Sequence, residues 1–410
     1  MSPVAESGRD KFGRGLPNLL VSTSAAAFGG SISSVAVSWI VYYYTHNAYY
    51  ISYLGMAGVI PGIALGLLAG VIADRYDRKV LMVSSDIIRM VSMAFLAIFL
   101  HLVAFSFPLI LAVMVLVYTF STIFQPASQA ILPMIVTKEG LENANGILQG
   151  SYSVFLALGS AAGGLVVAYL GAVWGLGINS MTYALSAIFL FMIAGNFKRS
   201  GRGVESRSSI GHELREGMRY MKEHLPVLEV TIGSLPANFF GSLITPFLVV
   251  YASAKFGGDS ASYGYLVASL AGGMALGSLL VGRINASRRA GMVIALGMLV
   301  VGFIVIILSL STNLYISLAV GVAVGVILGL INTTYISTIQ AIVPVEIIAR
   351  VLSIDTVGSF AAIPAGLAIG GVLISDYGIV LTYVVAGIGL LANGLIVLSM
   401  RGFRSLKYAS

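Results

Sequence analysis

The chain has 410 residues, of which 58% are hydrophobic and 10% are charged, and its mean hydropathy is +0.96. Soluble domains carry about 25% charged residues, so this composition indicates a membrane protein. The chain has no cysteine, which excludes disulfides, thiol nucleophiles, zinc–thiolate sites and iron–sulfur clusters. The net charge of +7 does not indicate nucleic acid, because the basic residues lie in short segments between apolar runs.

Twelve apolar runs are long enough to cross a bilayer, which takes about 20 helical residues. In chain order they are 16–44, 49–73, 80–103, 107–136, 142–171, 174–196, 226–254, 261–284, 290–310, 313–343, 346–374 and 379–400. Of the 23 Lys and Arg residues, only Lys255 falls on one side of this topology, and the other 22 fall on the opposite side. By the positive-inside rule, both termini are predicted to be cytoplasmic. We therefore expect an all-α membrane protein.

The sequence also repeats itself. Gln129-Ala-Ile-Leu-Pro133 recurs as Gln340-Ala-Ile-Val-Pro344, and Gly163-Gly164 recurs as Gly370-Gly371, at offsets of 211 and 207 residues. Two parallel six-helix repeats are typical of secondary transporters. The predicted domains begin with a cytoplasmic N-terminal segment, 1–15, and a first six-helix half, 16–196. A cytoplasmic linker, 197–225, leads to the second six-helix half, 226–400, and a cytoplasmic tail, 401–410, follows.

The linker 197–225 is the only long hydrophilic stretch of the chain. Its second part has apolar residues at helical spacing with basic residues between them, which predicts an amphipathic helix. This helix could lie on the cytoplasmic membrane surface, or it could be tucked under the helical bundle. The pattern fits both arrangements.

The densest charge in the chain lies between the second and third apolar runs. Five of the six residues from 74 to 79 are charged, and a series of glycines four residues apart leads into them, which predicts that the second helix packs closely on a neighbour. The glycines are Gly58, Gly62, Gly66 and Gly70, and the charged residues are Asp74, Arg75, Asp77, Arg78 and Lys79.

With the repeat and the central linker, this stretch resembles the signature of the major facilitator superfamily, Gly-x-x-x-Asp-Arg-x-Gly-Arg-Arg/Lys. Asp77 stands where the pattern has its second glycine, a departure shared by a branch that resembles multidrug and siderophore exporters. The resemblance implies that Asp74, Arg75 and Arg78 link helices 2, 3 and 11 as a cytoplasmic gate. The alternative is that these charges only anchor the topology, which we favour for Lys79.

Asp86 and Arg89 are three residues apart on the third helix, so their side chains can meet on one face. They are either functional residues of the gate or a simple ion pair near the cytoplasmic end. On the fifth helix, Gly159, Gly163 and Gly164 resemble the Gly-Pro-x-x-Gly-Gly motif of family exporters, with Ser160 in place of the proline. Ordinary packing of small residues would explain the same glycines.

Proton coupling usually needs a titratable group within the membrane. Asp355 is the first candidate, although it could instead pair with Arg350 or belong to the gate, and Glu229 is the second. The predicted substrate cavity is mostly neutral. Its candidate lining residues are Ser34, Trp39, Tyr118, Gln125, Gln149, Tyr152, Asn238, Asn332, Thr333 and Tyr335, any of which could instead make a hydrogen bond between helices.

The sequence predicts a secondary transporter that works by alternating access and exports a small lipophilic or amphipathic compound, multidrug-like or siderophore-like, in exchange for protons. An importer or facilitator of a small neutral metabolite is one alternative, and a membrane enzyme or assembly factor is another. No His-Glu-x-x-His, Gly-x-Ser-x-Gly or Gly-x-x-x-x-Gly-Lys motif occurs, so no catalysis, metal or cofactor is expected. We expect a monomer that spans a prokaryotic cell membrane many times.

Overall fold

The computed structural model describes residues 15–137, 140–195, 197, 218–281, 290–344 and 347–400. The regular elements in these ranges are helices. The chain separates into two compact units, each described by itself below. Of the described residues, unit 1 holds 15–44 and 60–197, and unit 2 holds 45–59 and 218–400.

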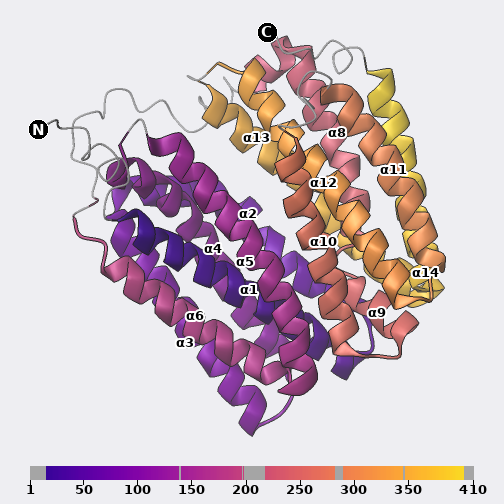
Figure 1. The fold of residues 1–410 in the computed structure, drawn as a ribbon, viewed down its shortest axis with the longest axis horizontal. Coiled ribbons are helices and arrows are strands. Elements are labelled where there is room, and N and C mark those ends of the chain that lie inside the picture. Colours follow the sequence, from indigo (N-terminus) through magenta and orange to yellow (C-terminus); the bar gives the residue numbers. More distant parts are fainter. Residues whose placement is uncertain are drawn as a thin grey trace, which may run out of the picture. The chain divides into compact units, whose positions relative to one another are not determined.

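Unit 1 is built from the helices of the first half of the chain, except for the start of α2 up to residue 59 (Figure 1). Their bounds are α1 (Leu16–Thr45), α2 (Ala48–Arg75), α3 (Arg78–Leu102), α4 (Phe107–Ile135), α5 (Leu141–Tyr169) and α6 (Ala172–Phe191). These bounds lie within a few residues of the predicted runs. The agreement follows because a chain that crosses lipid must satisfy its backbone polar groups internally, which a helix does along its whole length.

Unit 2 contains the helices of the second half of the chain (Figure 1). They are α8 (Leu225–Ser242), α9 (Leu248–Phe256), α10 (Ser260–Leu280), α11 (Ala290–Leu310), α12 (Leu314–Ile342), α13 (Ile348–Phe360) and α14 (Ala362–Ser399). The helical turn 218–223 precedes α8. There Met221 is buried, and Tyr220 Oη donates a hydrogen bond to the carbonyl of Ile342 at 3.2 Å, so the described end of the linker packs against the rest of unit 2.

Two predicted spans of unit 2 are interrupted. The predicted run 226–254 breaks at 243–247, between α8 and α9, where Pro246 cannot donate a backbone hydrogen bond. The predicted run 346–374 breaks at Ala361, three residues before Pro364. Helix α14 then continues through a kink at Gly378, whose φ of 85° lies in the left-handed region that favours glycine.

The described residues include ten helices that are long and apolar enough to cross a membrane. The last of them, Val357–Ser399, has 43 residues and contains the Gly378 kink, so it provides both the eleventh and the twelfth predicted crossings. Helices α8 and α9 together provide the seventh. The chain is therefore an all-helical membrane protein with about twelve membrane helices, as the sequence predicts.

The sequence repeat appears in the packing of both units. In unit 1, a Cβ atom on Gly159 of α5 would lie 2.4 Å from the carbonyl oxygen of Phe28 on α1. In unit 2, a Cβ atom on Gly366 of α14 would lie 2.5 Å from the carbonyl oxygen of Phe239 on α8. The two glycines are 207 residues apart and the two phenylalanines 211, so equivalent helix pairs make equivalent backbone contacts.

A second pair of glycine positions breaks the repeat. On α10, a Cβ atom on Gly273 or Gly277 would lie 2.4 or 2.0 Å from a backbone carbonyl oxygen of α12. The matching residues of α2, Gly62 and Gly66, have no atom of a described residue within 4 Å of a Cβ position. The prediction that this glycine series packs closely is therefore wrong at these two positions within unit 1, because no described residue of that unit approaches the helix face that they occupy.

The first part of α2 belongs to unit 2. Ser52 Oγ donates a hydrogen bond to the carbonyl of Leu367 on α14 at 2.7 Å. A Cβ atom on Gly371 would lie 2.3 Å from Ser52 Oγ. This end of α2 therefore packs on α14 at a position where only a glycine fits.

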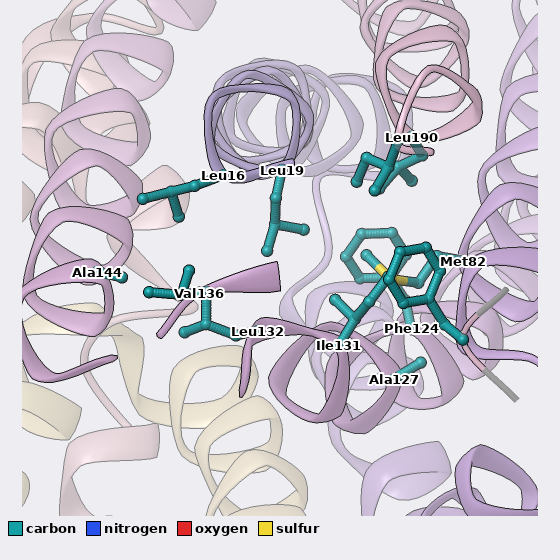
Figure 2. Close-up of a cluster of buried hydrophobic side chains, with 12 residues drawn as sticks. Leu16, Leu19, Met82, Phe124, Ala127, Ile131, Leu132, Val136, Ala144 and Leu190 are labelled. Carbon is teal, nitrogen blue, oxygen red and sulfur yellow. The ribbon is translucent and has the colours of Figure 1, made fainter. Parts of the chain in front are cut away.

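A buried apolar cluster fixes one end of unit 1 (Figure 2). Its side chains come from α1, α3, α4, α5 and α6, and include Leu19, Met82, Phe124, Ile131 and Leu190. Because the start of α3 and the end of α6 both contribute to this cluster, it holds in place the chain segments that carry the charged signature.

Candidate functional site

The charged signature lies at the junction of α2 and α3. Gly70, Asp74 and Arg75 fall in the last turns of α2, and their side chains lie outside what the structure describes. Asp77 occupies the N-cap of α3, where its Oδ1 accepts a hydrogen bond from the amide of Val80 at 3.1 Å. Its Oδ2 accepts a second from the amide of Phe197 at 3.0 Å.

Asp77 therefore satisfies the first turn of α3 and also ties down the chain that follows α6. A glycine, which the family pattern has at this position, could do neither, since both bonds use the carboxylate. The sequence contained the signal for the cap, because an aspartate lies three residues before the third apolar run. The bond to Phe197 spans 120 residues and left no local signal.

Lys79 and Arg78 also bind within unit 1. Lys79 Nζ donates to the carbonyl of Ile193 at 2.8 Å and lies 5.0 Å from the ring centre of Phe191. Since Ile193 lies just beyond the last turn of α6, the ammonium group stabilises exposed carbonyls at a helix C-terminus. Arg78 is buried, and its Nη1 lies 2.8 Å from the sulfur of Met134 on α4.

Asp86 and Arg89 form an ion pair within unit 1, and both residues are buried. The second carboxylate oxygen, Oδ2, accepts a hydrogen bond from Ser186 on α6 at 2.5 Å, and Ser186 in turn bonds to Ser22 on α1 at 2.7 Å. Arg89 also donates to Ser121 on α4 at 3.2 Å. Four helices thus meet at one ion pair.

The guanidinium of Arg89 is stacked as well as paired. Its Cζ lies 4.6 Å from the ring centre of Phe124 and 4.5 Å from that of Tyr183. Both oxygens of Asp86 have partners, and the charges of the pair cancel. This arrangement suits a structural role in holding α3, α4 and α6 together, because a paired buried charge is costly to separate.

Asp355 on α13 is also buried, with 4% of its surface exposed, but its neighbours are hydroxyl groups. Its Oδ1 accepts hydrogen bonds from Tyr335 at 2.5 Å, from Thr231 at 2.6 Å and from Ser359 at 3.5 Å. Ser359 bonds in turn to Ser234 on α8 at 2.5 Å. Among the described residues, none donates to Oδ2 and none supplies a positive charge to this group.

We call Asp355, Thr231, Ser234, Tyr335 and Ser359 the Asp355 cluster. The side chain of Arg350, the alternative partner that the sequence suggested, lies outside what the structure describes. Of the hydroxyl partners, Ser359 could have been found from the sequence because it lies four residues along the same helix. Thr231 and Ser234 come from another helix and could not.

The other predicted residues are spread through both units. Glu229 on α8 is half-buried. Among the predicted cavity residues, the structure exposes Ser34, Gln125, Gln149, Tyr152 and Asn332, and it leaves Tyr118, Asn238 and Thr333 half-buried. Tyr335 belongs to the Asp355 cluster, so its hydroxyl already has a protein partner.

Trp39 lies in a different environment from the rest of that set. It lines an open cleft of about 220 Å³ in unit 1, together with Tyr43, Tyr44 and Phe105. The rings of Trp39 and Tyr43 are stacked with centres 6.5 Å apart, and those of Tyr44 and Phe105 are stacked at 4.8 Å. Such an aromatic group at a helix end is typical of a membrane interface.

The glycines of the fifth helix lie against α1. A Cβ atom on Gly163 would lie 3.0 Å from the Cα atom of Ile32, one turn along from the contact of Gly159. Gly164 is buried next to them. These contacts are the close packing of small residues that membrane helices use. Within the described ranges, His, Asp and Glu side chains form no group that could hold a metal ion.

Residues 16–407 match a family of transport proteins, MFS_3, described as transmembrane secretion effectors. The multidrug efflux pump Tap of Mycolicibacterium fortuitum is 26% identical over 409 residues, covering 96% of this chain and 97% of the pump. Macrolide efflux protein A of Streptococcus pyogenes is 25% identical over 260 residues, covering 61% and 62%.

Among solved structures, the fold is similar to that of a bacterial homologue of the lysosomal transporter Spinster in an inward-facing, unoccupied conformation. The TM-score is 0.75 at 16% identity, and the match covers 96% of this chain and 98% of that one. At this identity the likeness concerns the fold alone. The family match extends over nearly the whole chain, and the chain is therefore a transporter, not an enzyme, of the MFS_3 family within the major facilitator superfamily.

Proposed function

We propose that this transporter exports small lipophilic or amphipathic compounds from the cell in exchange for protons. The proposal of efflux is supported by the similarity, along almost the full chain, to a relative named as a multidrug efflux pump. An importer or facilitator of a neutral metabolite would share the fold but not this likeness. We place the protein, as a monomer, in the cell membrane of a prokaryote, since the relatives named above are bacterial.

Proton coupling is assigned to Asp355. The observation that carries this assignment is the contrast between the two buried carboxylates. Asp86 is balanced by Arg89, whereas the described neighbours of Asp355 are neutral hydroxyls. A proton can therefore bind to and leave Asp355 while its surroundings stay intact, which a coupling site requires. Glu229, half-buried on α8, is the second candidate.

The cytoplasmic gate is assigned to Asp74, Arg75 and Arg78. In this proposal, Asp77 and Lys79 do not move with the gate but hold the start of α3 against the end of α6. Asp86 and Arg89 support the same helices from inside unit 1. The gate residues thus act from a rigid base, which lets a small change at one end move a whole helix.

The experiment uses inside-out membrane vesicles with an acidic interior and two probes, ethidium and erythromycin. Protons that leave the interior should drive uptake of a probe if the protein exchanges the two. Asp355→Asn should abolish uptake driven by the pH gradient but retain exchange of labelled for unlabelled probe. Asp376→Asn is the matched control, because Asp376 is an exposed carboxylate on the neighbouring helix α14.

Uptake of neither probe by the wild-type protein would contradict export of such compounds. Gradient-driven uptake by Asp355→Asn at the wild-type rate would contradict the coupling assignment and leave efflux standing. The same vesicles test the gate, since Asp74→Asn should slow transport while the amount of inserted protein stays constant.

A further inference from the structure

Unit 2 contains an apolar cavity of about 120 Å³. Its walls come from α8, the start of α9 and the segment between them, and from α10, α11, α12 and α14. They are lined mainly by aliphatic side chains and Met298, and hydroxyl groups are contributed only by Thr245 and Ser317. The space is partly open, since Thr245 at its edge is exposed.

The cavity is kept open by a glycine. Gly241 on α8 is one of its lining residues, and a Cβ atom at that position would have no atom within 4 Å. This separates Gly241 from Gly366 and Gly273, where a Cβ atom would collide with a backbone carbonyl. Helix packing therefore does not require a glycine at 241. Its absent side chain instead adds to the empty space.

The cavity lies beside the Asp355 cluster. Ala237 and Ile331 line the cavity, on α8 and α12. Ser234 precedes Ala237 by three residues, and Tyr335 follows Ile331 by four, so the cluster begins about one helical turn away on both helices. If the apolar group of an amphipathic ligand filled the cavity, the polar end of that ligand would face these hydroxyls or Thr245, which is exposed.

We infer that this cavity binds the compact apolar group, aliphatic or aromatic, of a transported compound. This inference rests on the proposed function and names the part of the substrate that unit 2 recognises. The volume is close to that of an engineered apolar cavity of about 150 Å³ that stays dry and binds benzene. A lipid acyl chain is too long for a space of this size, and the lining provides no charge to hold an ion.

The absence of cysteine from the chain allows a direct test on purified protein in detergent. Gly241→Cys places a single thiol in the cavity, and benzyl methanethiosulfonate labels it. The thiolate attacks the sulfenyl sulfur, a disulfide forms to the benzylthio group, methanesulfinate leaves, and the thiol proton passes to the buffer. Labelling is followed by the intact mass of the protein, with toluene as the competing ligand.

Toluene at roughly ten times its dissociation constant should slow the labelling of Gly241→Cys about tenfold, because only the empty cavity reacts. Gly272→Cys is the matched control. Gly272 lies on α10, also has no atom within 4 Å of a Cβ position, and does not line the cavity. Its labelling should be unaffected by toluene. Thr245→Cys at the exposed edge of the cavity provides a second labelled position, protected in the same way, if Gly241→Cys is not produced.

Labelling of Gly241→Cys or Thr245→Cys at a rate independent of toluene would overturn the inference. Equal slowing of Gly272→Cys would do the same, since it would show an effect of toluene on the micelle. Labelling is measured on purified protein and needs no transport. A negative labelling result therefore contradicts the cavity inference alone, whereas absence of probe uptake in vesicles contradicts the proposed function. In vesicles that transport ethidium, Gly241→Val should cut uptake at least several-fold, whereas Gly272→Val should leave it unchanged.

Discussion

Replacing Arg89 with methionine should destabilise the protein strongly. The change removes the only basic partner of Asp86 among the described residues and leaves that carboxylate, which has no exposed surface, with the hydroxyl of Ser186 alone. Removing one member of a buried pair costs about 3–5 kcal/mol, because the remaining charge is left without compensation. We therefore expect Arg89→Met to lower the free energy of unfolding by about that amount.

The double variant Asp86→Asn/Arg89→Met separates loss of the pair from loss of packing. Asparagine is neutral and can still accept the hydrogen bond from Ser186, so the double variant should regain about 2–3 kcal/mol relative to Arg89→Met. The control is Arg219→Met, which removes an exposed pair with Glu223 at 2.7 Å, with 78% and 55% of the two side chains exposed. An exposed pair contributes less than about 1 kcal/mol.

Unfolding of the purified protein in mixed micelles of increasing denaturing detergent, followed by circular dichroism, measures all three variants. The reasoning fails if Arg89→Met is no less stable than Arg219→Met. It also fails if the double variant is as unstable as Arg89→Met, because the loss would then come from the stacked rings and not from the unpaired carboxylate.

Three further changes test a close helix contact, a helix cap and a buried hydrogen bond by the same unfolding measurement. Gly159→Ala should lower the free energy of unfolding by about 1–3 kcal/mol, since its Cβ would lie 2.4 Å from a backbone carbonyl oxygen. The control Gly177→Ala, which has no described atom within 4 Å of its Cβ position, should be neutral or stabilising. Equal effects of the two changes would refute the close contact. Asp77→Ala should lower the free energy of unfolding by about 1 kcal/mol or more, and Asp77→Asn by less, because asparagine can still cap α3. If amide hydrogen exchange in the first turn of α3 is the same in Asp77→Ala as in the wild type, the cap is refuted. Tyr251→Phe should cost about 1–2 kcal/mol, since the buried hydroxyl donates to the carbonyl of Leu308 at 2.9 Å, and wild-type stability would contradict that bond.

The positions of the membrane helices could be predicted closely from the sequence. The predicted run 16–44 corresponds to α1, Leu16–Thr45, and the predicted run 290–310 corresponds to α11, Ala290–Leu310. Run length decides these bounds because a helix must cover the hydrocarbon core and a charged residue within that core is expensive. No long-range information is needed.

The interruptions could be predicted only in part, because proline has no fixed effect in a membrane helix. Pro126 and Pro133 lie inside α4 without ending it, whereas the chain breaks beside Pro246 and shortly before Pro364. Neighbouring helices and local hydrogen bonds decide whether the lost backbone bond is replaced. That decision depends on packing between distant segments, which periodicity does not reveal.

In the candidate site, too, the local features could be predicted from the sequence and the long-range contacts could not. The sequence singled out Asp86 and Asp355, because a carboxylate within an apolar run stands out. It could not tell that the first bonds to Ser186, 100 residues away, or that the second bonds to Thr231, 124 residues away. Serine and threonine are common in membrane helices and carry no signal of their partner. Thus the carboxylates were visible from the sequence, and the difference between their surroundings was not.

The repeat helps to separate scaffold from function. The contacts of Gly159 and Gly366 with a neighbouring backbone occur once in each unit, as expected for features that any six-helix half needs. The two carboxylates are not duplicated. At the offset of 211 the position matching Asp86 is Gly297, and at the offset of 207 the position matching Asp355 is Leu148. Each of these carboxylates therefore belongs to one half only and is not part of the scaffold that the two halves share. In the function proposed above, the hydroxyl-lined carboxylate of unit 2 binds the proton and the apolar cavity next to it binds part of the substrate, so that binding of one would influence binding of the other.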